Sequence, residues 1–437
     1  MPETLVTVKD IEKSSLTHLS RERDEPKWLY EKRMLALEHF NRLPVPSNRY
    51  TDLSEVNLDT LEFNAPKGDT AGHPTLIQFI KEAESAVGYI IQVNGETLKT
   101  GLSPDLASKG VILTDFQTAI RQQPALLERY YMSDAIRPET DKFTALHAAL
   151  CNTGALLYVP MDIQIREPII SLVINTAPGS VIFNHVLAVL ENGARVAFVE
   201  EQVSDEDKSA PMSVHSQVVE AFVHPNARFE FATLQSWGAR TYSFQRKKAL
   251  VHRDASASWT MGWLGGRLSQ SYLDNEMVGE GSSAEDLQVC FASERQHFDI
   301  QSNLGHRVGH TKGEVLVKGV LQDKSRFIFN GLIKIYPHAQ QSDAFQAAHT
   351  LLLNPGARAD AIPSLEIEAN DVRCTHSAST GPIDEEQIFY LMSRGLNEDE
   401  ARKMIVHGFF QPAIQRIPVQ SVRDSITRLV DLKWRSK

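Results

Sequence analysis

The sequence has 437 residues, which is enough for two or three structural units with a substantial core. Its 42% hydrophobic and 23% charged content is typical of a globular protein and excludes disordered and collagen-like chains. The net charge of -10, with no basic clusters, argues against nucleic-acid binding, and no apolar run approaches the roughly 18 residues of a membrane span.

Residues 1–140 are predicted to form a mainly helical N-terminal region. The chain starts with neither a secretory nor a transit pattern, which indicates a cytoplasmic protein. Pro26 suits the first turn of an amphipathic helix that ends at Leu43, where two prolines follow. Shorter helical signals lie at residues 74–82, 104–109, 114–122 and 124–131.

Residues 141–372 are rich in short β-type runs and are predicted to form the core of the protein. A turn residue, a small residue and then alternating side chains recur in APGSVIF from Ala177, ENGARVAF from Glu191, HPNARFEF from His224, HRDASASW from His252, QDKSRFIF from Gln322 and NPGARADA from Asn354. Several of these units are separated by roughly thirty residues, a spacing typical of folds whose repeats bury their faces by stacking. The pattern predicts a mainly β chain with a right-handed parallel β-helix, or β-solenoid. A β-sandwich is the alternative, since strand-rich sequence alone does not distinguish the two.

Residues 373–437 are predicted to form a C-terminal helical region. Capping residues at Asp384 and Asn397 begin two helices, and Gly395 and Gly408 suit their ends. A third helix, with apolar residues at helical spacing, follows Pro418.

Several motifs resemble binding or catalytic signatures but lack the context that those functions need. GEGSSA at residues 279–284 has the letters of a dinucleotide-binding turn without a preceding strand or a following helix. His306 and His310 have the spacing of zinc ligands, but the flanking glycines disfavour a helix. Glu366 and Glu368 would share a strand face, and solvated edge residues explain them better than acid–base chemistry. No phosphate-binding GxxxxGK[ST] loop occurs, so this chain alone is not expected to hydrolyse ATP.

The three cysteines are Cys151, Cys290 and Cys374, too few and too scattered for a disulfide framework, which indicates a reducing compartment. Cys374 and His376 lie two residues apart, so in an extended strand their side chains would project from one face. Thiolate and imidazole are ligands of Fe-S species and transition metals. By itself, the spacing favours a buried thiol beside a structural histidine.

The segment LEIEANDVRCTHSASTGPIDEEQIFYLMSRGL, from Leu365 to Leu396, closely resembles the C-terminal signature of the SufB/SufD family. EPKWLYEKRMLALEHFNRLPVP near the start, FTALHAALCNTGALLYVP from Phe143 and GVLQDKSRFIFNGLIKI from Gly319 also resemble that family. The similarity therefore covers most of the chain.

Two differences from SufB-like sequences make the chain resemble the SufD branch of the family. SufB-like sequences carry Glu-His-Glu where this chain has Thr375-His376-Ser377. They also carry a cysteine shortly upstream, whereas no cysteine lies between Cys290 and Cys374 here. The motif CTHSAST replaces the usual CSHGAT but keeps the Cys-x-His pair.

The resemblance implies a non-ATPase scaffold subunit of the SUF iron-sulfur cluster assembly system. It implies a pseudo-twofold heterodimer with SufB, built by β-helix contacts, and two copies of the SufC ATPase on the C-terminal helices. The interface histidine of the family maps onto His376, and Cys374 occupies its neighbouring cysteine, so iron or a cluster would sit there transiently. No tightly bound cofactor is expected, and a reduced flavin is associated with the family complex.

The helices from Asp384 to His407 and from Pro418 to Leu432 are expected to bind SufC, because an exposed apolar helix face suits docking into a groove. The residues expected to contribute are Phe389, Tyr390, Met392, Arg394, Met404, Ile405, Phe409 and Phe410. For any single residue, packing onto the end of the β-helix is the alternative.

Other functions stay open at this level. A SufB-like homodimeric scaffold would share the fold, and a homodimer could form in isolation. A polysaccharide-active β-helix enzyme would normally be secreted and would need a sugar groove with catalytic carboxylates. A purely structural repeat protein would leave Cys374 and His376 incidental. The plastid stroma is the alternative location, since a mature plant or algal protein has lost its transit peptide.

Overall fold

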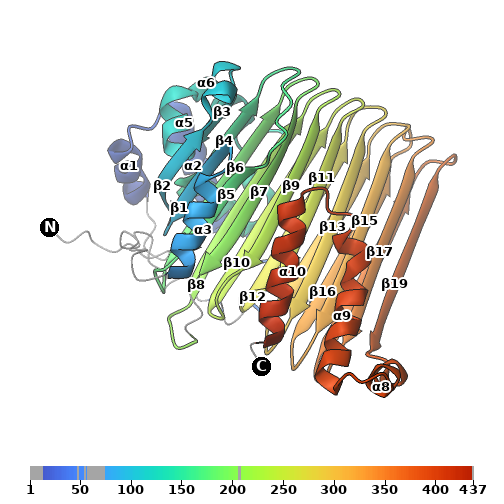
Figure 1. Cartoon of the computed structure of the whole chain (residues 1–437). Coiled ribbons are helices and arrows are strands. Elements are labelled where there is room, and N and C mark those ends of the chain that lie inside the picture. The colour runs from blue at the N-terminus through green and yellow to red at the C-terminus, as the bar shows by residue number, and fades with distance from the viewer. Residues whose placement is uncertain (1–12, 47–48, 54–55, 57–73, 205–207, 436–437) are drawn as a thin grey trace.

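The computed structural model describes residues 13–46, 49–53, 56, 74–204 and 208–435. The chain winds into a parallel β-solenoid of about eight turns, in which two sheets face each other and helices cover their outer surfaces (Figure 1). The predicted mainly β fold, with a parallel β-helix core and helical ends, is confirmed.

The two sheets contain ten and nine strands. The ten-stranded sheet contains, in spatial order, β19 (Arg373–Pro382), β17 (Asp343–Leu352), β15 (Lys312–Leu321), β13 (Ser283–Ala292), β11 (Ser256–Trp263), β9 (Arg228–Ser236), β7 (Arg195–Ser204), β5 (Ile169–Asn175), β1 (Gly88–Val93) and β2 (Glu96–Leu102). The nine-stranded sheet contains β18 (Arg358–Ile367), β16 (Arg326–Ile335), β14 (His297–His306), β12 (Leu268–Met277), β10 (Thr241–Val251), β8 (Ser213–Val223), β6 (Val181–Leu190), β4 (Thr153–Val159) and β3 (Ile112–Asp115). From β4 onward the chain alternates between the sheets, so each strand pairs in parallel with the strand two positions away.

Several of the helices cover the outer faces of the two sheets. They are α1 (Lys13–Glu22), α2 (Lys27–Arg42), α3 (Pro74–Glu84), α4 (Pro104–Ser108), α5 (Phe116–Gln122), α6 (Pro124–Tyr130), η3 (Pro138–Thr140), α7 (Lys142–Leu150), α8 (Glu385–Ser393), α9 (Glu398–Ile414) and α10 (Gln420–Arg435). Helices α1, α2, α5, α6 and α7 share one apolar cluster with the outer face of the nine-stranded sheet. Helices α9 and α10 share another with the outer face of the ten-stranded sheet (Figure 1).

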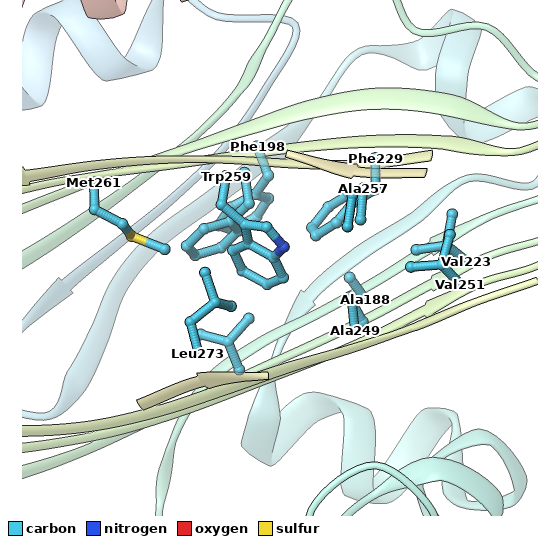
Figure 2. Close-up of a cluster of buried hydrophobic side chains, with 14 of the residues drawn as sticks. Ala188, Phe198, Val223, Phe229, Ala249, Val251, Ala257, Trp259, Met261 and Leu273 are labelled. Atoms are coloured by element: carbon cyan, nitrogen blue, oxygen red, sulfur yellow. The ribbon is translucent and has the colours of Figure 1, made fainter. Parts of the chain in front are cut away.

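Inward-pointing side chains of both sheets form one apolar core along the solenoid axis. In Figure 2, Phe198 and Trp259 of the ten-stranded sheet lie opposite Leu273 and Ala249 of the nine-stranded sheet. The Phe198 ring also stacks on Phe231 one turn further along, with ring centroids 5.7 Å apart. Each turn contributes only a few such residues, so their burial depends on the neighbouring turns.

Residues in the left-handed conformation precede several strands. Gly193, Asn226, Asp254 and Asp323 have φ angles of 70°, 61°, 55° and 59°, and they precede β7, β9, β11 and β16. Asn and Asp tolerate this conformation better than other residues with a side chain. The predicted turn-then-strand units therefore begin strands of a solenoid, and the parallel pairing rules out the sandwich alternative.

The N-terminal region contains a β-hairpin in addition to the predicted helices. Strands β1 and β2 pair antiparallel around Asn94 and Gly95, whose φ angles of 52° and 81° are those of a type I′ turn. Asn-Gly between apolar runs is a hairpin signal, and the prediction of a mainly helical region overlooked it. Residues 1–12 and 57–73 of this region lie outside the described residues.

Two element ends also differ from the prediction. The last strand, β19, runs to Pro382, so the solenoid extends past the predicted end at residue 372. Helix α9 continues through Gly408 to Ile414, because its apolar side stays buried against the ten-stranded sheet. Asp384 and Asn397 cap α8 and α9 as predicted, and Asn397 forms the expected capping box.

Candidate functional site

Cys374 and His376 both lie on β19, the last strand of the ten-stranded sheet. In the strand register Cys374 pairs with Ala344 and His376 with Gln346 of β17. Cys374 is half-buried and packs against the interior core, and the two-residue period of a strand puts His376 on the same inner face. The common face predicted for the pair is therefore the inner face, which points toward the solenoid axis.

No strand in the described part of the chain covers the outer edges of β18 and β19, which end the two sheets. Each strand is ten residues long. An uncovered edge of this length presents a row of free N–H and C=O groups that can pair with another chain. Pro363 interrupts this row on β18, because proline has no N–H, whereas β19 carries a proline only at its last residue.

The chemistry near the pair is that of an unactivated thiol. Burial, and then the negative charge of Asp343, raise the pKa of the Cys374 thiol above its ordinary value. The carboxylates of Glu366 and Glu368 lie 2.9 and 3.8 Å from the Lys334 ammonium, which accounts for them as ion-paired edge residues. A positive charge beside Cys374, such as a bound metal ion, would favour the thiolate.

Helices α8 and α9 expose an apolar surface, here called the α8–α9 face, that consists of Phe389, Tyr390, Met392 and Met404. Phe389 is 75% exposed, and the other three are between 43% and 57% exposed. The Arg394 guanidinium lies over the Tyr390 ring at 5.1 Å and donates a hydrogen bond to its hydroxyl, 3.1 Å away. These five of the predicted SufC-binding residues are exposed in this chain.

The other three predicted SufC-binding residues face the chain itself. Ile405 is half-buried against the cluster that anchors α8. Phe409 is half-buried, and the Lys318 ammonium lies 4.5 Å from its ring centroid. Phe410 is completely buried and packs near Phe291 of β13, so the expectation that it contacts a partner does not fit its position. The helical period turns this residue toward the sheet while Met404 faces outward.

The weaker motifs have the ordinary roles expected of them. His306 is buried at the end of β14, and its Nδ1 lies 2.7 Å from the Thr311 hydroxyl. His310 lies in a turn with a φ angle of 59°, so the two histidines do not share a helix. Residues 279–282 lie in the turn between β12 and β13, and residues 283 and 284 begin β13; a strand thus precedes this motif, contrary to the expectation, but a strand and not a helix follows it.

The interior also contains a row of hydrogen-bonded polar side chains that the sequence analysis did not predict. Gln202 Nε2 donates to Glu200 Oε1 at 2.6 Å, Gln245 Nε2 donates to Gln202 Oε1 at 3.3 Å, and the Lys247 ammonium donates to Gln245 Oε1. Burial lowers the pKa of Lys247 to about 7 and raises the pKa of Asp286 to about 6. Glu200 and Gln202 lie on β7, whereas Gln245 and Lys247 lie on β10, and the two pairs meet only because the turns stack, so no local pattern could have revealed the connection between them.

None of the helices in the described ranges is both long and apolar enough to cross a membrane.

Comparison with known proteins relates most of the chain to one family. The SufBD core domain of SUF system FeS cluster assembly matches residues 172–409, and the SufBD protein N-terminal region matches residues 18–170. The iron-sulfur cluster assembly protein SufD of Bacillus subtilis is 31% identical over 98% of this chain and 99% of its own length. An iron-sulfur cluster assembly SufBD family protein of Staphylococcus epidermidis is 29% identical over 93% of this chain and 89% of its own length. Both domains of the family are thus present in order on a solenoid with helical ends, and the chain belongs to the SufB/SufD family of the SUF iron-sulfur cluster assembly system.

Proposed function

We propose that this chain is the SufD-type scaffold subunit of a cluster assembly complex, which pairs with SufB and docks the SufC ATPase without hydrolysing ATP itself. The observation that carries the proposal is the position of Cys374 and His376 on the inner face of the last, uncovered strand. A partner that pairs with this strand would complete a site around both side chains.

Pairing with SufB would use the free edge of β19. Backbone pairing at a sheet edge is a common mode of protein association, and its affinity comes from main-chain hydrogen bonds. The proline within β18 favours β19 as the paired strand. Phe345 and Ile367 are 36% and 42% exposed near the same end, and a partner would remove these apolar side chains from water.

Cys374 and His376 would bind iron or a nascent cluster, as cargo, together with groups from the partner. A cluster iron takes thiolate or imidazole ligands, and this chain offers one of each at that edge. Two ligands leave a tetrahedral iron half coordinated, so the remaining ligands would come from the partner or from sulfide. Loading would release the thiol proton, because the raised pKa of Cys374 keeps the free thiol protonated. On the family resemblance alone, a reduced flavin would take part in the complex.

SufC would bind the α8–α9 face, where an exposed aromatic and methionine surface suits a partner groove. Helix α8 follows β19 directly, and the Ile383 N–H between them donates to the Leu352 carbonyl of β17 at 2.9 Å. Ile388 is buried and anchors α8 to α9. A displacement of α8 by SufC would therefore reach the strand that carries Cys374 and His376.

The proposal is tested by His376→Ala in cells that depend on this machine, with His349→Ala as the matched control. His349 lies one strand earlier, on the opposite face, and its Nδ1 is 2.7 Å from the Ser379 hydroxyl. We expect His376→Ala to abolish cluster assembly while the complex with SufB and SufC still copurifies, and His349→Ala to retain assembly. Full assembly by His376→Ala would contradict the role of this histidine. A homodimer that assembles clusters without SufB would instead favour the SufB-like alternative.

A further inference from the structure

A second group of metal-binding side chains is buried at the other end of the solenoid, between α7 and the nine-stranded sheet. His147 lies on α7, Cys151 directly follows that helix, and His185 lies on β6. All three are fully buried, and one ligand atom from each lies within 4.8 Å of the others. His147 and Cys151 are four residues apart, the spacing that places two side chains on one helix face.

Each histidine has a polar neighbour at the ring nitrogen that faces away from the group. His147 Nδ1 lies 3.1 Å from the Ser216 hydroxyl, and His185 Nε2 lies 3.2 Å from a Glu220 carboxylate oxygen. The backbone N–H groups of Met132 and Ile136 donate to that carboxylate at 2.7 and 3.1 Å. The other two nitrogens, His147 Nε2 and His185 Nδ1, therefore face each other. Metal-binding histidines are commonly oriented in this way by a carboxylate or hydroxyl on the second nitrogen.

The spacing of the donor atoms fits a tetrahedral ion. Two nitrogens that bind zinc at about 2.0–2.1 Å in tetrahedral geometry are about 3.3 Å apart. His147 Nε2 and His185 Nδ1 are 3.4 Å apart. Cys151 Sγ lies 3.5 Å from the Thr153 carbonyl and 3.8 Å from the Phe183 carbonyl, and it also has a hydrogen-bond contact with the Tyr131 hydroxyl.

The surroundings offer a further ligand, and the Arg33 guanidinium, which donates to the Cys151 carbonyl at 2.6 Å, is already ion-paired to Glu25 at 2.8 Å. The buried Tyr131 hydroxyl near Cys151 has no nitrogen or oxygen hydrogen-bond partner among the described residues, and it is a candidate for the fourth position. A Cys151 thiolate and the Glu220 carboxylate together would balance a divalent ion, which removes the cost of a buried unpaired charge. Two imidazoles and one thiolate are ligands of zinc, whereas magnesium and calcium bind oxygen.

We propose that His147, Cys151 and His185 bind one Zn²⁺ ion that ties α7 to the outer face of the nine-stranded sheet. The role is structural, because the donors are fully buried and would take up the ion as the N-terminal helices pack. The competing explanation is a metal-free hydrogen-bonded chain that runs from Glu220 through both imidazoles to Ser216. The two differ in one measurable respect, which is the metal content of the folded chain.

The test uses the full chain, purified with a tag that does not bind metal, unfolded in a chelator and refolded with or without Zn²⁺. We expect one zinc per chain by elemental analysis, a higher melting temperature with zinc, and a thiolate-to-metal absorption band when Co²⁺ replaces zinc. Cys151→Ser should lose the metal and the band. Cys290→Ser is the matched control, since Cys290 is equally buried but lies in the apolar core on the axis, and it should retain both.

Two further variants test where the zinc binds and replace Cys151→Ser if that variant does not fold. The double variant with Cys374→Ser and His376→Ala should retain the zinc, and loss of the zinc there would move the ion to the end of the solenoid and overturn the proposal. Glu220→Gln keeps the side-chain shape and serves if Cys151→Ser does not fold; it should weaken zinc binding by about tenfold or more. Zinc-free refolded wild type, or an equal zinc content in Cys151→Ser, would also overturn the proposal.

Discussion

Phe389 and Phe410 allow packing and docking to be separated by the same chemical change. Phe389 lies on α8 and is 75% exposed, whereas Phe410 lies on α9 and is fully buried. Truncation of a buried phenylalanine to alanine typically costs about 3–5 kcal/mol. Only a quarter of the Phe389 surface is buried, and a quarter of the roughly 3 kcal/mol for a fully buried side chain is about 0.7 kcal/mol. Phe410→Ala should therefore destabilise the chain several times more than Phe389→Ala.

For SufC binding we expect the opposite order, with the larger loss of affinity in Phe389→Ala. An exposed aromatic residue at the centre of an interface commonly contributes about 2 kcal/mol or more, which corresponds to a roughly 30-fold weaker Kd on truncation. We expect Phe389→Ala to weaken SufC binding by about that factor at a temperature where both variants are folded, and Phe410→Ala to weaken it much less.

The assay combines thermal or urea unfolding of the chain alone with titration calorimetry against SufC. A loss of stability in Phe389→Ala as large as that in Phe410→Ala would mean that α8 packs against the chain in solution, contrary to its exposure. Unchanged SufC affinity in Phe389→Ala would remove the α8–α9 face from the docking proposal.

Two further predictions concern stability alone, and the second of them compares two glycine variants. Burial raises the pKa of Asp286 to about 6, so the folded chain holds this proton more tightly than the unfolded chain, and the free energy of unfolding falls as pH rises from about 4 to 6. Asp286→Asn should flatten that decline in urea unfolding, with a gain on the order of 3 kcal/mol above pH 6; an unchanged pH profile would mean that the carboxylate is well solvated. Gly408→Ala, in the interior of α9 with open space around the new methyl group, should stabilise by about 0.5–1 kcal/mol. Gly95→Ala, in the left-handed turn between β1 and β2, should destabilise by about 1 kcal/mol or more, and equal melting temperatures for the two variants would refute the assignment of the turn.

The solenoid was predictable because its signal is local and repeated. Several turns place a residue such as Asn226 or Asp254 in the left-handed conformation two positions before an alternating strand, so the turn residue and the strand pattern lie in one short stretch of sequence. The Cys374–His376 face was predictable for the same reason, since it follows from a spacing of two. The hairpin at Asn94 and Gly95 also had a local signal, which the helical character of the flanking segments obscured.

The features that the sequence did not predict depend on which strands and helices become neighbours in space. His185 meets His147 and Cys151 only because α7 packs over β6, and nothing near His185 in the sequence records that contact. Phe410 belongs to the core because α9 continues for two more turns beyond a glycine and stays on the sheet. Helical periodicity identifies an apolar side, but it does not say whether that side faces the same chain or a partner.

The two ends of the solenoid differ in a way that limits the size of an assembly. The ten-stranded sheet ends at one side in β2, an exposed strand that carries charged residues, with Lys99 ion-paired to Glu84 at 2.8 Å. The nine-stranded sheet ends at that side in β3, which has only four residues and pairs antiparallel. Charged and short edges of this kind oppose further strand pairing. Among the described strands, an assembly that joined such chains through β19 would thus have one usable end per subunit, so it would close at two subunits and not grow into a filament.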